Sequence, residues 1–115
     1  MGRPSMTGRF IYSPRAKRQL NEINDWITKA ASAEVAKRFL TEVRAHIESL
    51  STFSMAGRAH GDIRPGLRTS TLKRRTVIAY VVDEDSDGRV ITILGVFHGG
   101  QDWMRALSAD EDPAP

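Results

Sequence analysis

The chain has 115 residues, 40% of them hydrophobic and 27% charged, which is the length and composition of a single globular domain and argues against general disorder. It contains no cysteine, which excludes a disulfide scaffold, a thiolate metal site and a cysteine nucleophile, and its formal net charge is +3. The longest apolar run, Val77–Val82, is far shorter than the roughly 20 residues of a membrane-spanning helix. We expect a cytoplasmic domain without a membrane segment.

The first third of the chain is predicted to form a short strand followed by a helix. Arg9–Tyr12 has the composition of a strand. Ser13 and Pro14 then suit the N-cap and the first position of a helix. Apolar residues at positions 16, 20, 23 and 27 extend this helix to about Ala30. Trp26 flanks the apolar face, and we assign it to the core.

A second amphipathic helix is predicted after Ser32. Apolar residues recur at helical spacing from Val35 to Leu50, while charged residues occupy the opposite face. Only a residue or two around Ala31 and Ser32 separates the two helical patterns. A connection this short predicts an antiparallel helical hairpin.

The second half of the chain has the patterns of strands. A loop is predicted from Phe53 to Pro65. Because two strands are apolar on both faces, the second face of the sheet needs cover from the terminal helix, loops or a partner. We predict an α+β fold, in which the helical hairpin packs on a small, mostly antiparallel sheet. The expected elements are strands at Leu67–Thr71, Thr76–Asp83 and Val90–Phe97, turns at Lys73-Arg74 and Asp85–Gly88, and a short helix at Gln101–Leu107.

Charge is concentrated in two segments. Between Gly57 and Arg75 there are six cations and one anion. Such a basic region suits nucleic acid, an acidic protein segment or an acidic enzyme surface, and it also suits a simple solvated surface. Residues 108–115 are expected to be a disordered acidic tail and residues 1–8 a flexible one, which leaves a folded domain over 9–107.

The three histidines are the first residues to consider for acid–base chemistry. His46 and His60 are predicted to be surface residues without a functional role. His98 ends an apolar strand beside two glycines and near Asp102. It suits a general base at pH 7, but we favour a structural role in which it bonds Asp102 or a backbone carbonyl. No pair of histidines has the helical spacing of a metal site, so no metal and no cofactor are predicted.

Five segments follow one another in a distinctive order and spacing: Tyr12–Ala16, Asp62–Arg68, Val77–Val82, Val90–Phe97 and His98–Asp102. Together they resemble the ParE branch of the RelE/ParE superfamily, the toxins of type II toxin–antitoxin systems. The resemblance covers residues 9–107. It implies the fold expected above, a helical hairpin packed on a small antiparallel sheet.

The resemblance also implies partners. ParE-branch toxins poison DNA gyrase by trapping it on cleaved DNA, whereas RelE-branch toxins cut mRNA on the ribosome. Both are held inactive by an acidic antitoxin segment. We therefore expect a cognate antitoxin, ParD-like or similar, in a hetero-oligomer with this chain, and DNA gyrase as the target. No sequence-specific nucleic-acid binding by the toxin alone is expected.

The ending His98, Gly99 and Asp102 resembles the gyrase-directed branch, although an arginine is frequent there where Gln101 stands. A ParE-type toxin implies no catalytic residue. The gyrase-binding candidates are then Trp103, Met104, Arg105, Arg64 and Arg68. The antitoxin-binding candidates are Arg58, Arg64, Arg68, Arg74 and Arg75.

Two alternatives remain at this point. One is a RelE-like ribosome-dependent mRNA endonuclease, which would use His98, Arg64, Arg68 and Arg74. It is disfavoured because no tyrosine follows Tyr80, which lies in an apolar strand and is assigned to the core. The other alternative is an inactive module that only binds the antitoxin.

Overall fold

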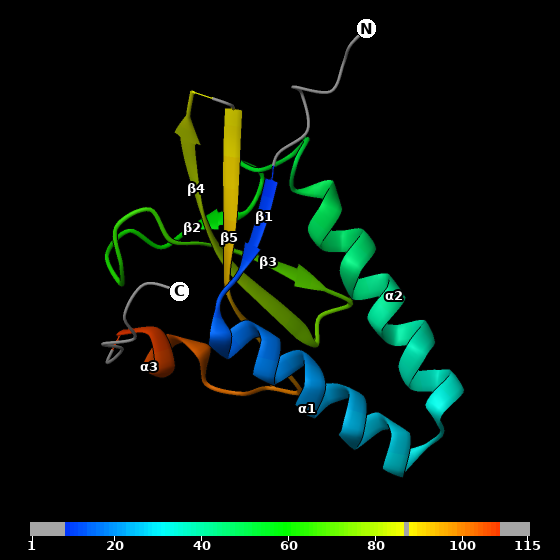
Figure 1. Ribbon diagram of the computed structural model, residues 1–115. Coiled ribbons are helices and arrows are strands. Elements are labelled where there is room, and N and C mark those ends of the chain that lie inside the picture. Colours follow the sequence, from blue (N-terminus) through cyan, green and yellow to red (C-terminus); the bar gives the residue numbers. More distant parts are fainter. Residues whose placement is uncertain (1–8, 87, 109–115) are drawn as a thin grey trace, which may run out of the picture.

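A helical hairpin covers one face of a five-stranded sheet, and a short helix with a neighbouring loop covers part of the other face (Figure 1). The computed structural model describes residues 9–86 and 88–108. The strands lie in the order β1-β5-β4-β3-β2, with β1 parallel to β5 and the other pairs antiparallel. The predicted α+β fold is confirmed. Its elements are β1 (Arg9–Tyr12), α1 (Pro14–Ala30), α2 (Ala33–Ser49), β2 (Arg58–Ala59), β3 (Arg68–Leu72), β4 (Thr76–Asp85), β5 (Gly88–His98) and α3 (Trp103–Ser108).

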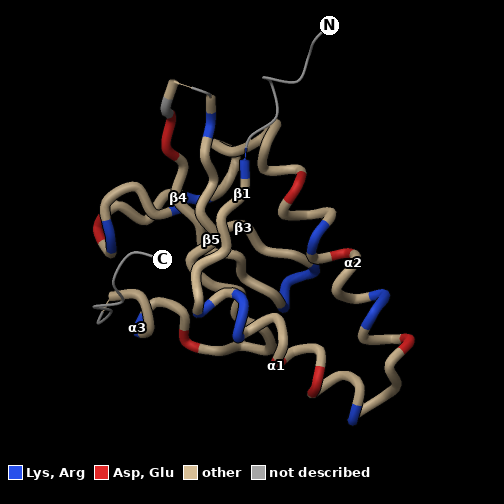
Figure 2. The backbone as a smooth tube through the Cα atoms, in the orientation of Figure 1, with Lys and Arg blue, Asp and Glu red and all other residues tan. Residues whose placement is uncertain are grey.

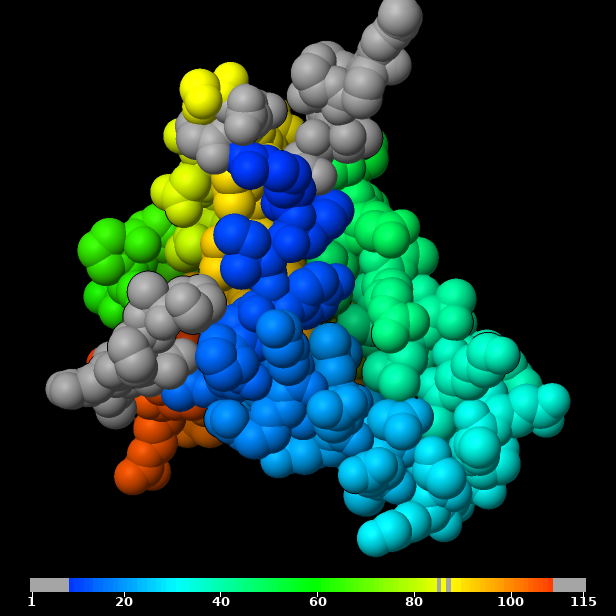
Figure 3. Space-filling view, in the orientation of Figure 1, coloured from blue at the N-terminus to red at the C-terminus, as the bar shows by residue number. Residues whose placement is uncertain are grey.

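Two serine N-caps define the helical hairpin. Ser13 Oγ accepts a hydrogen bond from the backbone N–H of Ala16 at 3.1 Å, and Ser32 Oγ accepts one from Val35 at 3.1 Å. The connection between the helices is as short as predicted, so α1 and α2 lie side by side (Figure 3). Acidic and basic residues are interspersed along both helices (Figure 2), which is typical of amphipathic helices with one solvated face.

The main core lies between the hairpin and the sheet. The apolar stripes of both helices meet the side chains of β4 and β5 that point toward the hairpin. Tyr80 is fully buried in this layer, as predicted, and its hydroxyl donates to Ser54 O at 2.8 Å. The fully buried or nearly buried members are Ala16, Ile23, Ile27, Ala36, Val43, Ile47, Leu50, Ile78, Tyr80, Ile91, Ile93 and Val96.

A smaller core covers the second face of the sheet. Leu67, Ala79, Phe97 and Leu107 are buried there, and Trp103 packs against them. The terminal helix and the loop before β3 therefore provide the cover that the apolar strands require. α3 extends to Ser108, the residue at which the predicted acidic tail begins. The rest of both predicted tails lies outside the described residues.

Side chains complete the outer edge of β5 where β1 no longer reaches it. β1 pairs with β5 only up to Ile93. After Ile93, side chains bond the free edge of β5: Ser13 Oγ donates to Leu94 O at 3.0 Å, and Gln19 Oε1 accepts from the N–H of Val96 at 2.7 Å. Gln101 Oε1 accepts from the N–H of His98 at 3.0 Å. The start of α1 and the turn after β5 are thereby fixed to the end of the sheet where His98 lies.

The segment from Phe53 to Pro65 is not entirely a loop, contrary to the sequence prediction. Arg58 and Ala59 form β2, which pairs with the first residues of β3. Arg68 holds the preceding turn, because its Nη1 donates to Gly57 O at 2.7 Å and to Met55 O at 3.1 Å. A two-residue strand leaves no periodic pattern in a sequence, and only its partner strand reveals it.

The turn between β3 and β4 is predicted to be more stable with glycine at position 74. Lys73 and Arg74 have φ values of 53° and 62°, and Arg75 N donates to Leu72 O at 3.1 Å. Side chains cost about 1–2 kcal/mol in left-handed backbone, and glycine relieves this strain at the expense of a more flexible unfolded chain. We expect Arg74→Gly to raise the free energy of unfolding by about 0.5–1 kcal/mol in urea titrations. Arg75→Gly, at a position without positive φ, should lower it.

Candidate functional site

The basic residues of the middle segment do not form a single patch, which corrects the sequence-based expectation of one basic region. Arg58, Arg64 and Arg68 lie at or before the start of β3, whereas Arg74 and Arg75 follow its end. Four residue steps along β3 already separate Arg68 from Leu72 by roughly 13 Å. The antitoxin-binding candidates therefore divide between the two ends of one strand.

The four residues of the endonuclease alternative are divided in the same way. His98 lies opposite Thr76 in the β4–β5 register, which places it next to the β3–β4 turn that contains Arg74. Arg68 lies opposite Tyr80, further along β4. Arg64 lies in the loop before β3, beyond Arg68. The fold thus brings His98 near Arg74 and keeps both away from Arg64 and Arg68.

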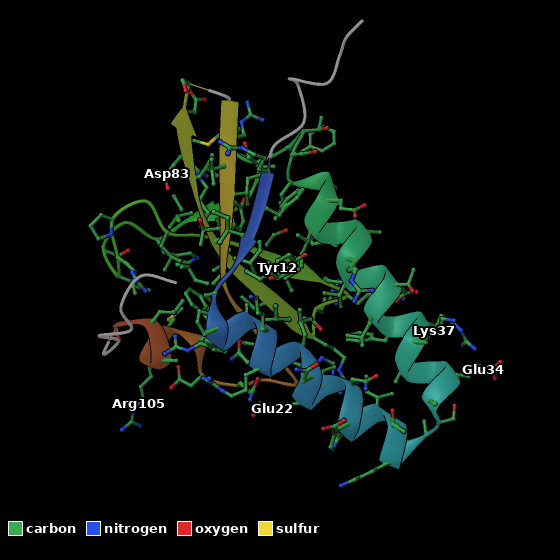
Figure 4. The ribbon with its side chains drawn as sticks, in the orientation of Figure 1. Tyr12, Glu22, Glu34, Lys37, Asp83 and Arg105 are labelled. Atoms are coloured by element: carbon green, nitrogen blue, oxygen red, sulfur yellow. The ribbon has the colours of Figure 1, made fainter. Side chains whose placement is uncertain are left out.

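The first candidate site is the α3 surface, formed by Trp103, Met104 and Arg105, whereas the fourth candidate, Arg64, belongs to the loop before β3. Trp103 is half-buried, and its ring meets the His60 ring edge-on at 4.7 Å between centroids. Met104 is 50% exposed, and Arg105 points away from the body of the protein (Figure 4). Asp102 Oδ1 accepts from the N–H of Arg105 at 3.1 Å and so stabilises the start of α3. The second core thus holds a short helix that presents Met104 and Arg105 to solvent.

The second candidate site is a cavity of about 350 Å³ between α1 and the end of β5. Trp26 stands at its rim and is 57% exposed, so its predicted place in the core is wrong. The reason is that Ile23 and Ile27 already face the sheet, and Trp26 lies on the flank of that stripe. The lining residues are Gln19, Glu22, Ile23, Trp26, Arg75, His98, Gly99 and Gln101.

His98 has a structural partner other than those predicted. Its Nδ1 lies 2.9 Å from Thr76 Oγ1, whereas Asp102 caps α3. Its ring packs between Trp26 and Phe39, with centroid distances of 5.9 and 5.1 Å. Burial lowers the pKa of His98, and the positive charge of Arg75 lowers it further. His98 is therefore neutral at pH 7 and links β4, β5 and both helices.

The structure places the other two histidines in hydrogen bonds as well. His46, predicted to be a surface residue, is half-buried, and its Nε2 lies 2.7 Å from Ser70 Oγ on β3. His60 Nε2 lies 2.9 Å from Thr69 Oγ1 on the opposite face of the sheet. Within the two described ranges, no three histidine or acidic side chains come together as a metal site. None of the described helices is long and apolar enough to span a membrane.

Comparison with known protein families shows to which family the chain belongs. The family model of the ParE toxin of type II toxin–antitoxin systems, parDE, matches residues 10–103. The chain belongs to this ParE toxin family. The match includes α1, α2, every strand except the first residue of β1, and the first residue of α3.

Two curated relatives and one solved structure agree with this membership. Toxin ParE1 of Mycobacterium tuberculosis, in strains CDC 1551/Oshkosh and H37Rv, is 29% identical over 102 residues, which cover 89% of this chain and all of that protein. The solved structure is described as the chromosomal ParDE toxin–antitoxin system from P. aeruginosa. It matches with a TM-score of 0.66 and 21% identity over 82% of this chain and 98% of that chain. At this identity the structure supports the fold alone.

Membership in the ParE family makes the chain a toxin of a type II toxin–antitoxin system, and this family implies an antitoxin partner. Most of the predicted binding residues are exposed, namely Arg58, Arg74, Arg75, Met104 and Arg105. Arg64, Arg68 and Trp103 are partly buried, and Arg68 donates to backbone carbonyls. The cavity that Trp26, Arg75 and His98 line was not predicted from the sequence. No motif links these three positions, because they come from α1, the β3–β4 turn and β5.

Two half-buried histidines, His46 and His98, are expected to make the fold less stable in mild acid. Burial lowers the pKa values of His46 and His98 from the ordinary value of 6.5, so protonation is easier in the unfolded chain. Their contribution is complete above about pH 6.5 and is lost as the pH falls through the lower pKa values of the folded protein. We expect a lower urea midpoint at pH 5.5 than at pH 7.5, with a smaller difference in His98→Gln. A midpoint that is unchanged or higher at pH 5.5 would contradict this.

Proposed function

We propose that this ParE-family toxin inhibits DNA gyrase by protein–protein contact through its α3 surface, and that a ParD-like cognate antitoxin neutralises it in a hetero-oligomer. The observation that carries the proposal is the exposed pair Met104 and Arg105 on a helix held by the second core. Exposed methionine and arginine side chains on a rigid support are typical of protein interfaces. Gyrase acts in the cytoplasm, which is the proposed compartment.

The arrangement of His98 and the arginines supports binding over catalysis. A ribonuclease of this fold would need a proton-transfer group together with cations that stabilise the charged transition state. Here His98 and Arg74 lie at one end of β3, and Arg64 and Arg68 at the other. This separation counts against the endonuclease alternative. Assays of gyrase inhibition and of mRNA cleavage distinguish the proposal from an endonuclease and from an inactive antitoxin-binding module.

The test uses purified chain freed of antitoxin in two parallel assays. One assay measures gyrase supercoiling and DNA cleavage, and the other measures cleavage of mRNA on translating ribosomes. We expect trapped, cleaved DNA and intact message. Cut message with normal gyrase would replace the proposal with an endonuclease, and folded protein without either activity would favour the inactive module.

A double substitution, Met104→Ala with Arg105→Glu, tests the α3 surface itself. Both side chains are exposed, so the fold should remain intact while gyrase inhibition falls. Lys37→Glu is the matched charge reversal, because Lys37 projects from the outer face of α2 (Figure 4). Removal of all residues after Gly100 is unsuitable, since it would also remove Leu107 and Trp103 from the second core.

A further inference from the structure

The cavity beside His98 has the features of a site that receives a side chain from a partner. Trp26 and His98 line it, and Phe39 supports the His98 ring from α2. We use the name Trp26 surface for Trp26, Arg75 and His98, the cavity that these three residues line, and the neighbouring residues Phe39 and Arg74. Its volume of about 350 Å³ lies within the range of protein ligand pockets, about 300–1,000 Å³. A tryptophan that is 57% exposed beside such a cavity leaves a large apolar area uncovered.

The rim of the cavity is cationic on one side. Arg75 lines it, and Arg74 is the preceding, exposed residue of the β3–β4 turn. Lys73, by contrast, is paired with Glu42 at 2.9 Å. His98 adds no charge at pH 7, because burial lowers its pKa. Arg75 is thus a cation beside an apolar cavity, and a carboxylate is its natural partner.

The β3–β4 turn keeps these cations in a strained backbone. Turns with two positive φ values favour asparagine and glycine, but this chain places Lys73 and Arg74 there. Strained positions of this kind cluster at binding sites, where the side chain itself is needed. The adjoining turn after β5 contrasts with it, because Gly99 and Gly100 have positive φ values and open space around them.

Two glutamines give the cavity fixed polar groups. Gln19 and Gln101 both line it, and each uses its amide oxygen to accept a hydrogen bond from an N–H of β5. The amide NH₂ of each is left to donate to the backbone carbonyls of a bound segment. A peptide that lies across the cavity would therefore meet oriented donors as well as an apolar hollow.

We propose that the Trp26 surface is the docking site of the antitoxin, which places an apolar side chain in the cavity and a carboxylate against Arg75. The inference rests on the proposed function for the presence of an antitoxin. A peptide is favoured over a nucleic acid because apolar side chains, Ile23 and Trp26, line the cavity together with one arginine, Arg75, which suits an apolar side chain beside a single carboxylate and not a chain of phosphates. The site is built on the hairpin side of β5, and α3, which carries Met104 and Arg105, packs on the other face.

The first test follows the environment of Trp26 directly. In a Trp103→Phe chain, Trp26 is the remaining tryptophan, and the purified cognate antitoxin is the probe. We expect antitoxin binding to move the Trp26 fluorescence to shorter wavelength, because the ring leaves water. A complex that forms without any change in Trp26 fluorescence overturns the proposal. If no complex forms even with the wild-type chain, the proposed function fails first, and this docking site falls with it.

The second test measures affinity with matched substitutions. Trp26→Ala should weaken antitoxin binding at least about 30-fold, the loss expected of an interface hot spot, and Arg75→Glu should weaken it as much or more. Phe53→Ala removes a similarly exposed aromatic residue beyond the far end of α2, and Lys37→Glu reverses a charge outside the site. Both controls should bind as the wild type does. Equal affinity of all four variants contradicts the proposal, and circular dichroism checks that each is folded.

Discussion

Ser13→Ala is expected to lower the free energy of unfolding by about 2–3 kcal/mol, a large loss for the removal of one oxygen atom. Ser13 is 1% exposed, and its side chain makes two hydrogen bonds, one within the first turn of α1 and one to β5, far away in the sequence. Its Oγ accepts from Ala16 N and caps α1, which contributes about 1 kcal/mol. It also donates to Leu94 O, and an acceptor buried without its donor costs about 1–3 kcal/mol.

Ser32→Ala is the matched control for this prediction. Ser32 caps α2 through the same type of bond, to the N–H three residues further on, but that bond is exposed, and the Ser32 side chain makes no second hydrogen bond to any described residue elsewhere in the fold. Its loss should be about 1 kcal/mol, as for an ordinary N-cap. Urea unfolding of both variants measures the difference. Equal losses would mean that the bond from Ser13 to Leu94 adds nothing to the cap.

Gly57→Ala is expected to be the second large effect, with a loss of about 2–3 kcal/mol. A Cβ atom at position 57 would lie 2.7 Å from Thr69 O and against the Tyr80 hydroxyl. Thr69 is a residue of β3 that pairs with β2, and Tyr80 is fully buried, so neither can withdraw without moving the sheet. Overpacking of this kind typically costs about 1–3 kcal/mol. Gly61→Ala is the control, because its Cβ would meet nothing within 4 Å.

A double-mutant cycle with Tyr80→Phe tests the cause of this loss. Tyr80→Phe alone should cost about 1 kcal/mol, because the hydrogen bond to Ser54 O disappears. The same substitution removes the nearest of the three atoms that the new Cβ would meet. The combined variant should therefore lose less stability than the sum of the single variants. Additive losses would place the clash at the two atoms that remain, Thr69 O and the ring Cζ of residue 80.

Much of the fold follows from local spacing in the sequence. The helical stripes, the Ser13 cap, the joint at Ala31 and Ser32 and the strands β3 to β5 were predicted within a few residues. Each depends on neighbours within about four positions, or on the alternation of a single strand, and the sequence shows such patterns directly. Family membership likewise follows from the order and spacing of short motifs along the chain.

The tertiary structure alone decided where the candidate binding residues lie. Six cations that lie within one segment of the sequence, residues 58–75, are separated in the fold by the length of β3. Trp26 and Arg75, by contrast, are far apart in the sequence but line one cavity. His98 bonds Thr76 because of the β4–β5 register, not because of any neighbour in the chain. Strand register and helix packing set these distances, and they depend on the whole buried core. The sequence by itself therefore determined the elements and the family, and tertiary packing determined which side chains share a surface.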